Sequence, residues 1–210
     1  MPARRATDAD LDAVVGALVE SHLDYVWEAW ALPGPGRREK LTALVWHHVE
    51  LIDLPYREIW MHEDWAAAAV WRPEPAAPVA DEAVERMAEV ARSVFGARLA
   101  LIEEVDAMVL ARRPDEPHRF LGTMGVRPDR QRQGLGTALL QPVLEELDHA
   151  GAPACLETSS PGNVKFYGSL GFTVVAHLDD LPAEAPETWV MWRTPAGSPG
   201  TARPAPSDGR

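Results

Sequence analysis

The chain is poor in cysteine and in positive charge, and each shortage excludes a class of protein. Its 210 residues include one cysteine, Cys155, so no disulfide can form within the chain. Against 32 aspartate and glutamate residues it has 20 lysine and arginine residues, which gives a net charge of −12. Nucleic acids and anionic membranes attract basic surfaces. We therefore expect neither as a partner.

Long hydrophobic runs are also missing. The sequence has no stretch of about 18 apolar residues, the length that a membrane-spanning helix needs. The N-terminal segment MPARRATDADLDAVV contains two arginines but lacks the apolar region of a signal peptide. What is present, 46% hydrophobic and 25% charged residues, is ordinary for a globular protein. These features predict a cytoplasmic protein with one folded domain.

Hydrophobic periodicity and the positions of glycine and proline predict alternating helices and strands. Helices are expected after Asp10, from the breaker segment at 32–38 to about Leu54, at 81–112 with a break near Gly96, from the glycines near residue 135 to Ala150, and at 163–170. Strands are expected at 58–62 and 65–72, which would form a hairpin, and at 118–126, 152–160, 171–178 and 188–193. Residues 1–194 would form the domain. The segment 195–210 lacks apolar periodicity and is expected to be a disordered C-terminal tail.

Two glycines lie where one of these strands gives way to a helix, in the segment Val126–Leu140 (VRPDRQRQGLGTALL). Main-chain N–H groups at a helix N-terminus bind anions, and glycine lets a phosphate approach closely. The dinucleotide-binding fingerprint needs a third glycine where this chain has Leu139, and the P-loop needs a Gly-Lys-Ser/Thr tripeptide that is missing. Arg127, Arg130 and Arg132 favour a polyanionic ligand over a simple tight turn, although solvated arginines would give the same pattern.

Two segments resemble known signatures. GVRPDRQRQGLGTALL is similar to the acetyl-CoA signature of the GCN5-related N-acetyltransferases, and NVKFYGSLGF, about 30 residues later, resembles that family's second signature. The similarity to puromycin-type members covers roughly residues 117–193, whereas the first 57 residues match only through HLDY. The resemblance implies an α/β fold with a mixed, mostly antiparallel central sheet and four or five flanking helices. It also implies acetyl transfer from acetyl-CoA to a primary amine, most like that of a puromycin-like aminonucleoside antibiotic.

The resemblance further implies roles for individual residues. Tyr167, protonated at neutral pH, would protonate the thiolate leaving group, and Glu157 would either accept the proton of the amine or form a structural hydrogen bond. Pantetheine would lie along Met124, Gly125 and Val126, with a strand bulge at Gly125. The other expected cofactor contacts are Gln131, Arg132, Gln133, Gly134, Leu135, Gly136, Thr137 and Asn163, the last of which is also a candidate helix N-cap.

An acceptor pocket is expected around the end of the first helix. Tyr25, Trp27 and Trp30 would form an aromatic wall there, and Asp24 or Glu28 would attract the amine. The alternative for the three aromatic residues is core packing, because tryptophan and tyrosine often pack in cores.

Two other functions remain open. One is acetylation of a peptide or protein α-amine, which would require an open groove. The other is a non-enzymatic acyl-CoA-binding regulatory module, which would need neither Tyr167 nor Glu157. The histidines at 47–48 and the segment HED at 62–64 lack the partners and spacing of a metal site, so no metal is expected. Cys155 is expected to be a buried hydrophobic residue. The expected partner is a small-molecule amine, and the expected oligomeric state is a monomer or a homodimer.

Overall fold

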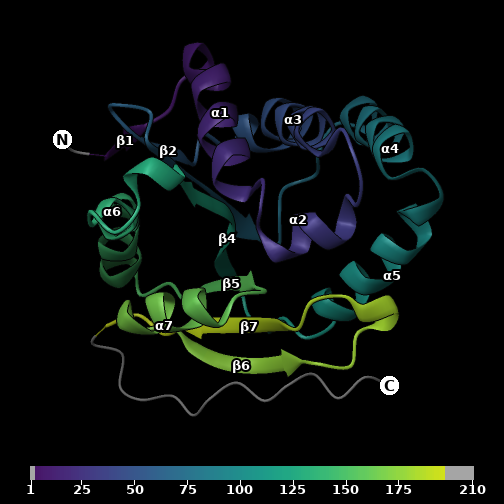
Figure 1. The fold of residues 1–210 in the computed structure, drawn as a ribbon. Coiled ribbons are helices and arrows are strands. Elements are labelled where there is room, and N and C mark those ends of the chain that lie inside the picture. Colours follow the sequence, from purple (N-terminus) through teal and green to yellow (C-terminus); the bar gives the residue numbers. More distant parts are fainter. Residues whose placement is uncertain (1–2, 197–210) are drawn as a thin grey trace.

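A seven-stranded sheet runs through the computed structural model, which describes residues 3–196 (Figure 1). Its strands are β1 (Ala3–Arg5), β2 (Ile59–His62), β3 (Ala67–Glu74), β4 (His118–Val126), β5 (Ala154–Thr158), β6 (Thr173–Leu178) and β7 (Thr188–Arg193). They lie in the order β1-β2-β3-β4-β5-β7-β6, and all neighbours are antiparallel except β4 and β5. The expected mixed, mostly antiparallel sheet is thus confirmed. The tail expected at 195–210 lies outside the described residues from 197 onward.

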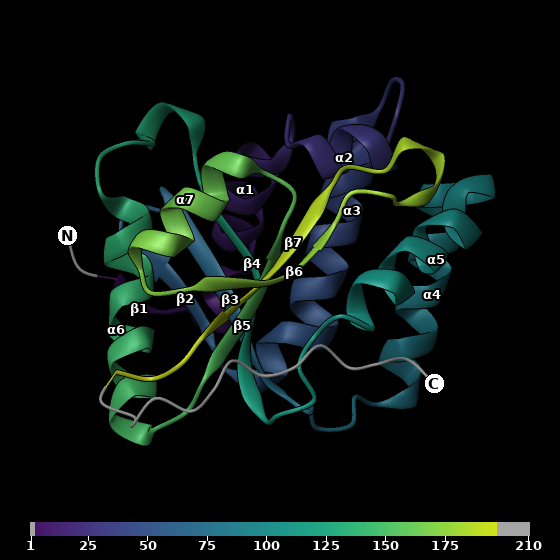
Figure 2. The same cartoon turned by 90° about the horizontal axis from the view of Figure 1, so that it is seen from below.

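Helices cover both faces of the sheet (Figures 1 and 2). They are α1 (Leu11–His22), α2 (Val26–Ala31), α3 (Arg37–His48), α4 (Asp81–Phe95), α5 (Leu99–Leu110), α6 (Leu135–Ala150) and α7 (Pro161–Ser169). One core cluster joins α6 and α7 to one face, and two others join α1, α3 and α5 to the opposite face. In the part of the chain that is described, no helix has both the length and the hydrophobicity needed to cross a bilayer.

The number of helices exceeds the four or five expected. Gly96 adopts a left-handed conformation (φ 54°) and divides the helical stretch at 81–112 into α4 and α5, close to the expected break. The helix expected from the breaker segment at 32–38 to about Leu54 starts at Arg37, at the end of that segment, and its last turns at Val49–Asp53 are π-helical. Wider π-helical turns occur frequently at functional sites.

An ion pair between Arg193 and Asp148 connects the end of β7 to α6. Arg193 donates two hydrogen bonds of 2.7 Å to the carboxylate of Asp148, and its Nε donates to the carbonyl of Leu170 at 3.0 Å. The main-chain N–H of Ala196 donates to the same carboxylate at 2.7 Å. Because Arg193 is buried, its charge depends on Asp148 for compensation.

Candidate active site

The sheet opens between β4 and β5. The two strands pair in parallel only where Arg119–Leu121 meets Ala154–Leu156, whereas the pairing of β4 with β3 continues to Val126. The segment Gly122–Val126 therefore has a strand on one side and a gap on the other. Main-chain donors and acceptors along that free edge can pair with an extended ligand, as they would with another strand.

A bulge lies at the start of this gap. Thr123 pairs with Val70 and Leu121 pairs with Trp71, so Gly122 is the extra residue on β4. The expectation that Gly125 forms the bulge is therefore wrong. Gly125 has another role, because a Cβ added there would lie 1.7 Å from the hydroxyl of Ser21, so glycine allows α1 to pack directly onto β4.

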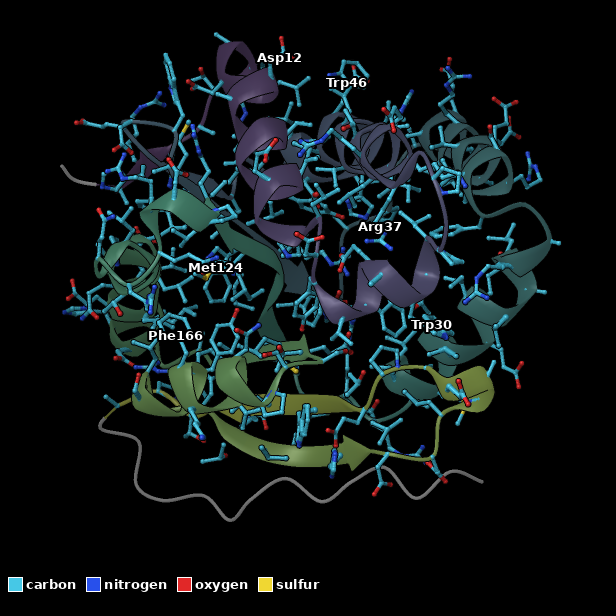
Figure 3. All side chains as sticks on the ribbon, in the orientation of Figure 1. Asp12, Trp30, Arg37, Trp46, Met124 and Phe166 are labelled. Carbon is cyan, nitrogen blue, oxygen red and sulfur yellow. The ribbon has the colours of Figure 1, made fainter. Side chains whose placement is uncertain are left out.

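The expected pyrophosphate loop leads into α6. Its members Gln131, Arg132, Gln133 and Gly134 precede the helix, and Leu135, Gly136 and Thr137 form its first turn. Gly134 has φ 79°, a left-handed conformation that favours glycine, and it is the N-cap of α6. A Cβ on Gly136 would lie 2.9 Å from Cε of Met124 and 3.2 Å from Cζ of Phe166, two side chains that Figure 3 shows beside α6. Gly134 thus provides the left-handed backbone conformation before α6, and Gly136 allows Met124 and Phe166 to pack closely against that helix.

The three arginines near this loop differ in their partners. Arg127 pairs with Asp129 at 3.2 Å, and Arg130 pairs with Asp64 at 2.6 Å. Arg132 is exposed, adopts φ 61°, and has no carboxylate within 4.0 Å among residues 3–196. Arg132 is therefore the charge of the three that is best placed to meet an anionic ligand at the start of α6.

A cavity of about 790 Å³ begins at the gap between β4 and β5 and is walled by α1–α5, β3 and α7. Its volume lies in the range typical of small-molecule sites. Met124, Glu157, Asn163 and Tyr167 line it, and so do Tyr25, Trp27 and Glu28. Residues that were assigned to the cofactor and residues that were assigned to the acceptor thus share one cavity.

Tyr167 is 7% exposed and packs between Phe166 and Phe172, with ring centroids 5.1 and 5.9 Å away. Its hydroxyl lies 3.9 Å from the sulfur of Met124, which is a weak acceptor. Burial raises the pKa of Tyr167 well above its usual value. The hydroxyl is consequently protonated at neutral pH and available to a stronger acceptor.

Tyr25 links α2 to the end of β5. Its hydroxyl lies 2.9 Å from the hydroxyl of Thr158 and accepts the main-chain N–H of Ser159 at 2.6 Å. Asn163 donates to the same Thr158 hydroxyl at 3.1 Å. Ser160, and not Asn163, is the N-cap of α7, so the alternative of Asn163 as the cap is wrong. These hydrogen bonds connect the acceptor side of the cavity with the cofactor side.

Glu157 forms a two-pronged ion pair with Arg113, at 2.6 Å from Nε and 3.1 Å from Nη2. The same guanidinium lies over the ring of Phe120 with its Cζ 3.7 Å from the centroid. Both carboxylate oxygens of Glu157 are therefore engaged. This arrangement favours the structural interpretation of Glu157 over its use as a base.

The residues expected to bind the acceptor separate into two groups. Trp27 and Glu28 line the cavity, whereas Trp30 packs under the guanidinium of Arg98 and donates to the carbonyl of Ala183 at 2.9 Å. Trp30 therefore has a packing role, and Asp24 is exposed outside the cavity lining. Oε2 of Glu28 is buried and has no hydrogen-bond partner in the described part of the protein. Burial raises the pKa of Glu28 to about 7.

Sequence reasoning missed several cavity residues. His22 lies at the end of α1, and His48 pairs with the buried Asp53 at 2.8 Å. Asp106 of α5 also lines the cavity, and its burial raises its pKa to about 6. No spacing pattern marks these residues, because four different elements bring them together.

Within residues 3–196, no three His, Cys, Asp or Glu side chains are grouped so that they could hold a metal ion. Cys155 is fully buried, and burial raises its pKa to about 12.

Comparison with known proteins adds independent evidence. A solved structure from Corynebacterium glutamicum, described as histone acetyltransferase HPA2 and related acetyltransferase, is 25% identical, covers 93% of this chain and 98% of its own, and has a TM-score of 0.68. Drosophila melanogaster polyamine N-acetyltransferase is 17% identical with a TM-score of 0.56, covering 91% of this chain and 98% of its own. Aedes aegypti arylalkylamine N-acetyltransferase 2 is 13% identical with a TM-score of 0.58, covering 91% and 97%. The last two likenesses concern the fold.

The family itself follows from the sequence match. The model of the acetyltransferase (GNAT) family matches residues 49–172, which run from the end of α3 through the gap between β4 and β5 to the end of α7. This range contains the loop before α6, Tyr167 and Asn163. The chain belongs to the acetyltransferase (GNAT) family, whose members transfer an acetyl group from acetyl-CoA to an amine.

Proposed function

We propose that this enzyme acetylates the primary amine of a small cationic molecule with an apolar body. A puromycin-like aminonucleoside is the example that the resemblance to puromycin-type enzymes suggests. The observation that carries the proposal is the 790 Å³ cavity, which joins Tyr167 and Met124 to a chamber between α2 and α5. Apolar side chains such as Trp27 and Leu44 line this chamber, as do the carboxylates of Glu28 and Asp106.

The residues present fit the acetyl-CoA that this family uses. The free edge of β4 at Gly122–Val126 offers main-chain groups to an extended chain, and Met124, Gly125 and Val126 would contact pantetheine there. The N-terminus of α6, with Gly134 and Arg132 before it, offers N–H groups and one unpaired positive charge to a pyrophosphate.

Acetyl-CoA supplies an acetyl group activated as a thioester. Groups that line the cavity attract the acceptor, stabilise the developing negative charge and transfer protons. The carboxylate of Glu28 attracts the ammonium of the acceptor into the cavity. Main-chain N–H groups at the β4 bulge stabilise the negative charge that develops on the carbonyl oxygen. Tyr167 donates its proton to the departing sulfur. Arg113 and Glu157 fix the wall between α5 and β5 against which the acceptor lies.

The two alternatives predict different features. A peptide or protein α-amine as acceptor calls for an open groove, whereas here residues of α2, α3, α4 and α5 all line one cavity, which supports a small molecule. A module that only binds acyl-CoA needs no proton donor, but Tyr167 lies in the cavity with a hydroxyl that lacks a strong acceptor. Both features support a catalyst acting on a small molecule.

An acceptor panel tests the proposal. The purified protein is mixed with acetyl-CoA and one amine at a time, and free thiol is measured. The panel contains a puromycin-like aminonucleoside, an arylalkylamine, an aliphatic diamine and a peptide with a free N-terminus. Thiol release with one or more small amines and none with the peptide is the expected result. Release with the peptide alone, or tight acetyl-CoA binding with no release at all, would overturn it.

We further infer that the enzyme acts in the cytoplasm as a monomer or a homodimer. The acidic composition and the single cysteine support that compartment. Light scattering on the purified protein measures the oligomeric state directly.

A further inference from the structure

The imidazole of His22 is held in one tautomer at the end of α1. Its Nδ1 lies 2.8 Å from the carbonyl oxygen of Leu18 and 2.9 Å from the hydroxyl of Ser21, which itself donates to that carbonyl at 2.8 Å. A carbonyl oxygen can only accept, so the ring proton lies on Nδ1. Nε2 therefore carries the lone pair of the ring and can accept a proton, and its neighbour is the hydroxyl of Thr123 at 3.5 Å.

That lone pair faces the β4 bulge. Nε2 of His22 lies 3.5 Å from the hydroxyl of Thr123, the residue next to Met124. A Cβ on Gly125 would come within 3.3 Å of Cε1 of His22, so the missing side chain leaves room for the ring. His22 and Tyr167 line the same cavity from opposite faces of the sheet, His22 from α1 and Tyr167 from α7.

Charge and burial keep the ring neutral. Burial is the main cause that lowers the pKa of His22, and the hydrogen bond to Leu18 opposes it only in part. The titratable or charged groups that line the same cavity as the ring are Tyr25, Glu28, His48, Asp53, Arg72, Glu103, Asp106, Arg113, Glu157 and Tyr167. Asp53 is paired with His48. Of the carboxylates among them, Glu157 is bound by Arg113, and the pKa values of Glu28 and Asp106 are raised.

We propose that His22 is the general base of the acetyl transfer, which deepens the proposed function and rests on it. Nε2 accepts one proton from the ammonium of the acceptor. The freed nitrogen pair forms the N–C bond to the acetyl carbon as the C–S bond breaks and its electron pair leaves on sulfur. The hydroxyl of Tyr167 protonates the sulfur, and the second proton of the amine nitrogen, lost as the amide forms, restores the hydroxyl of Tyr167. His22 then releases its proton to solvent, so one amide, one thiol and one proton result.

The pH dependence of kcat/KM tests this role. His22→Gln keeps a hydrogen-bonding side chain but cannot take up the proton. We expect kcat/KM at neutral pH to fall by about 10²–10⁴-fold, the usual size of lost acid–base catalysis. In the wild type, protonation of His22 sets the acidic limb of the kcat/KM profile. In the variant this limb should be absent, and kcat/KM should rise instead with deprotonation of the acceptor amine.

His47→Gln is the matched control. His47 makes the same bond, from Nδ1 to the carbonyl of Ala43 at 2.8 Å, but it does not line the cavity. This variant should retain the wild-type profile. Thermal unfolding of both variants verifies that they are folded.

A second readout uses the wild-type protein without any substrate. Nitrogen-15 NMR of the histidine rings should show His22 with its proton on Nδ1 and a pKa below 6.5, its usual value. A proton on Nε2 would overturn the proposal, as would a His22→Gln enzyme with an unchanged acidic limb. These results differ from failure of the proposed function itself, in which the wild-type enzyme would acetylate no small amine.

Discussion

Within residues 3–196, the one acceptor near the hydroxyl of Tyr167 is the thioether of Met124. Tyr167→Phe keeps the ring packed between Phe166 and Phe172 and removes only the proton donor. We expect kcat to fall by about 10²–10⁴-fold and the acetyl-CoA affinity measured by calorimetry to stay within error. Tyr56→Phe, which removes a hydroxyl bonded to the carbonyl of Ala77 outside the cavity, is the control. Wild-type turnover in Tyr167→Phe would remove tyrosine from the mechanism.

Glu28 has a carboxylate with one buried oxygen, and this burial costs stability when the carboxylate is charged. Its pKa of about 7 in the folded protein lies above the usual value, so the folded state retains a proton that the unfolded state loses. Stability is therefore lost as pH rises from about 4.3 toward 7, and the loss persists above pH 7. Glu28→Gln removes it, so at pH 8 the variant should unfold at the same or a higher temperature than the wild type.

The same substitution should weaken acceptor binding. We expect KM for a cationic acceptor to rise by about tenfold, equivalent to about 1.4 kcal/mol, with acetyl-CoA affinity unchanged. Glu82→Gln on the exposed side of α4 should change neither quantity. An unchanged KM for every cationic amine in Glu28→Gln would show that the carboxylate does not contact the acceptor.

The role of Glu157 could not be predicted from the sequence of β5 alone. Its position in β5 suggested a base or a structural group, and the deciding partner, Arg113, lies far away in the sequence after α5. Glu157→Gln should leave the shape of the pH–rate profile intact and lower the stability by about 1–3 kcal/mol, because the half-buried guanidinium of Arg113 loses its nearest counter-charge and keeps only Glu74, at 3.8 Å. Urea unfolding and kcat/KM against pH measure the two effects. A lost acidic limb would restore Glu157 as the base.

The loop before α6 should bind its ligand with a salt dependence that one arginine dominates. Arg127 and Arg130 already have carboxylate partners, whereas Arg132 has none in the described chain. Arg132→Ala should weaken acetyl-CoA binding about 3- to 10-fold at 0.1 M salt and flatten the dependence up to 1 M, where the screening length falls to about 3 Å. Arg127→Ala should do neither. Equal losses in both variants would contradict the assignment.

Elements with long periodic patterns could be predicted, and short ones could not. The expected strand at 118–126 coincides with β4, and the glycines were correctly expected to lead into α6. The three residues of β1 and the six of α2 are too short to show a period. The bulge was misplaced at Gly125 because a bulge depends on the register between two strands, and that register involves β3.

The ion pair between Asp148 and Arg193 joins segments 45 residues apart and contributes to the stability of the whole protein. Arg193 is the main cause that lowers the pKa of Asp148. A lowered folded pKa gives stability that is present above the unfolded value of about 3.9 and is lost as pH falls through the folded value. Asp148→Asn should therefore cost about 1–3 kcal/mol at pH 7 and progressively less below pH 4. Urea unfolding at several pH values gives the difference, and a constant difference would contradict this account.

At the scale of the molecule, the sequence groups the proposed cofactor residues by motif, whereas it shows only part of the cavity expected to hold the acceptor. The two signatures place Tyr167, Asn163 and the loop before α6 within one local stretch of chain. Glu28 was expected in the acceptor pocket, but His22 and Asp106 were not, because tertiary packing brings them there from two helices whose sequences contain no shared motif. Of the aromatic residues expected to line the acceptor pocket, Trp27 lines the cavity, whereas the ring of Trp30 packs against Arg98.

The gap between β4 and β5 also bears on the stability of the folded protein. A sheet that lacks interstrand pairing along part of β4 has fewer bonds to break on unfolding, and a ligand that binds there only in the folded state restores them. At one hundred times its dissociation constant such a ligand adds about 2.7 kcal/mol to folding. If acetyl-CoA binds along this edge as proposed, saturating acetyl-CoA should therefore raise the unfolding temperature of the protein and slow its proteolysis in vitro.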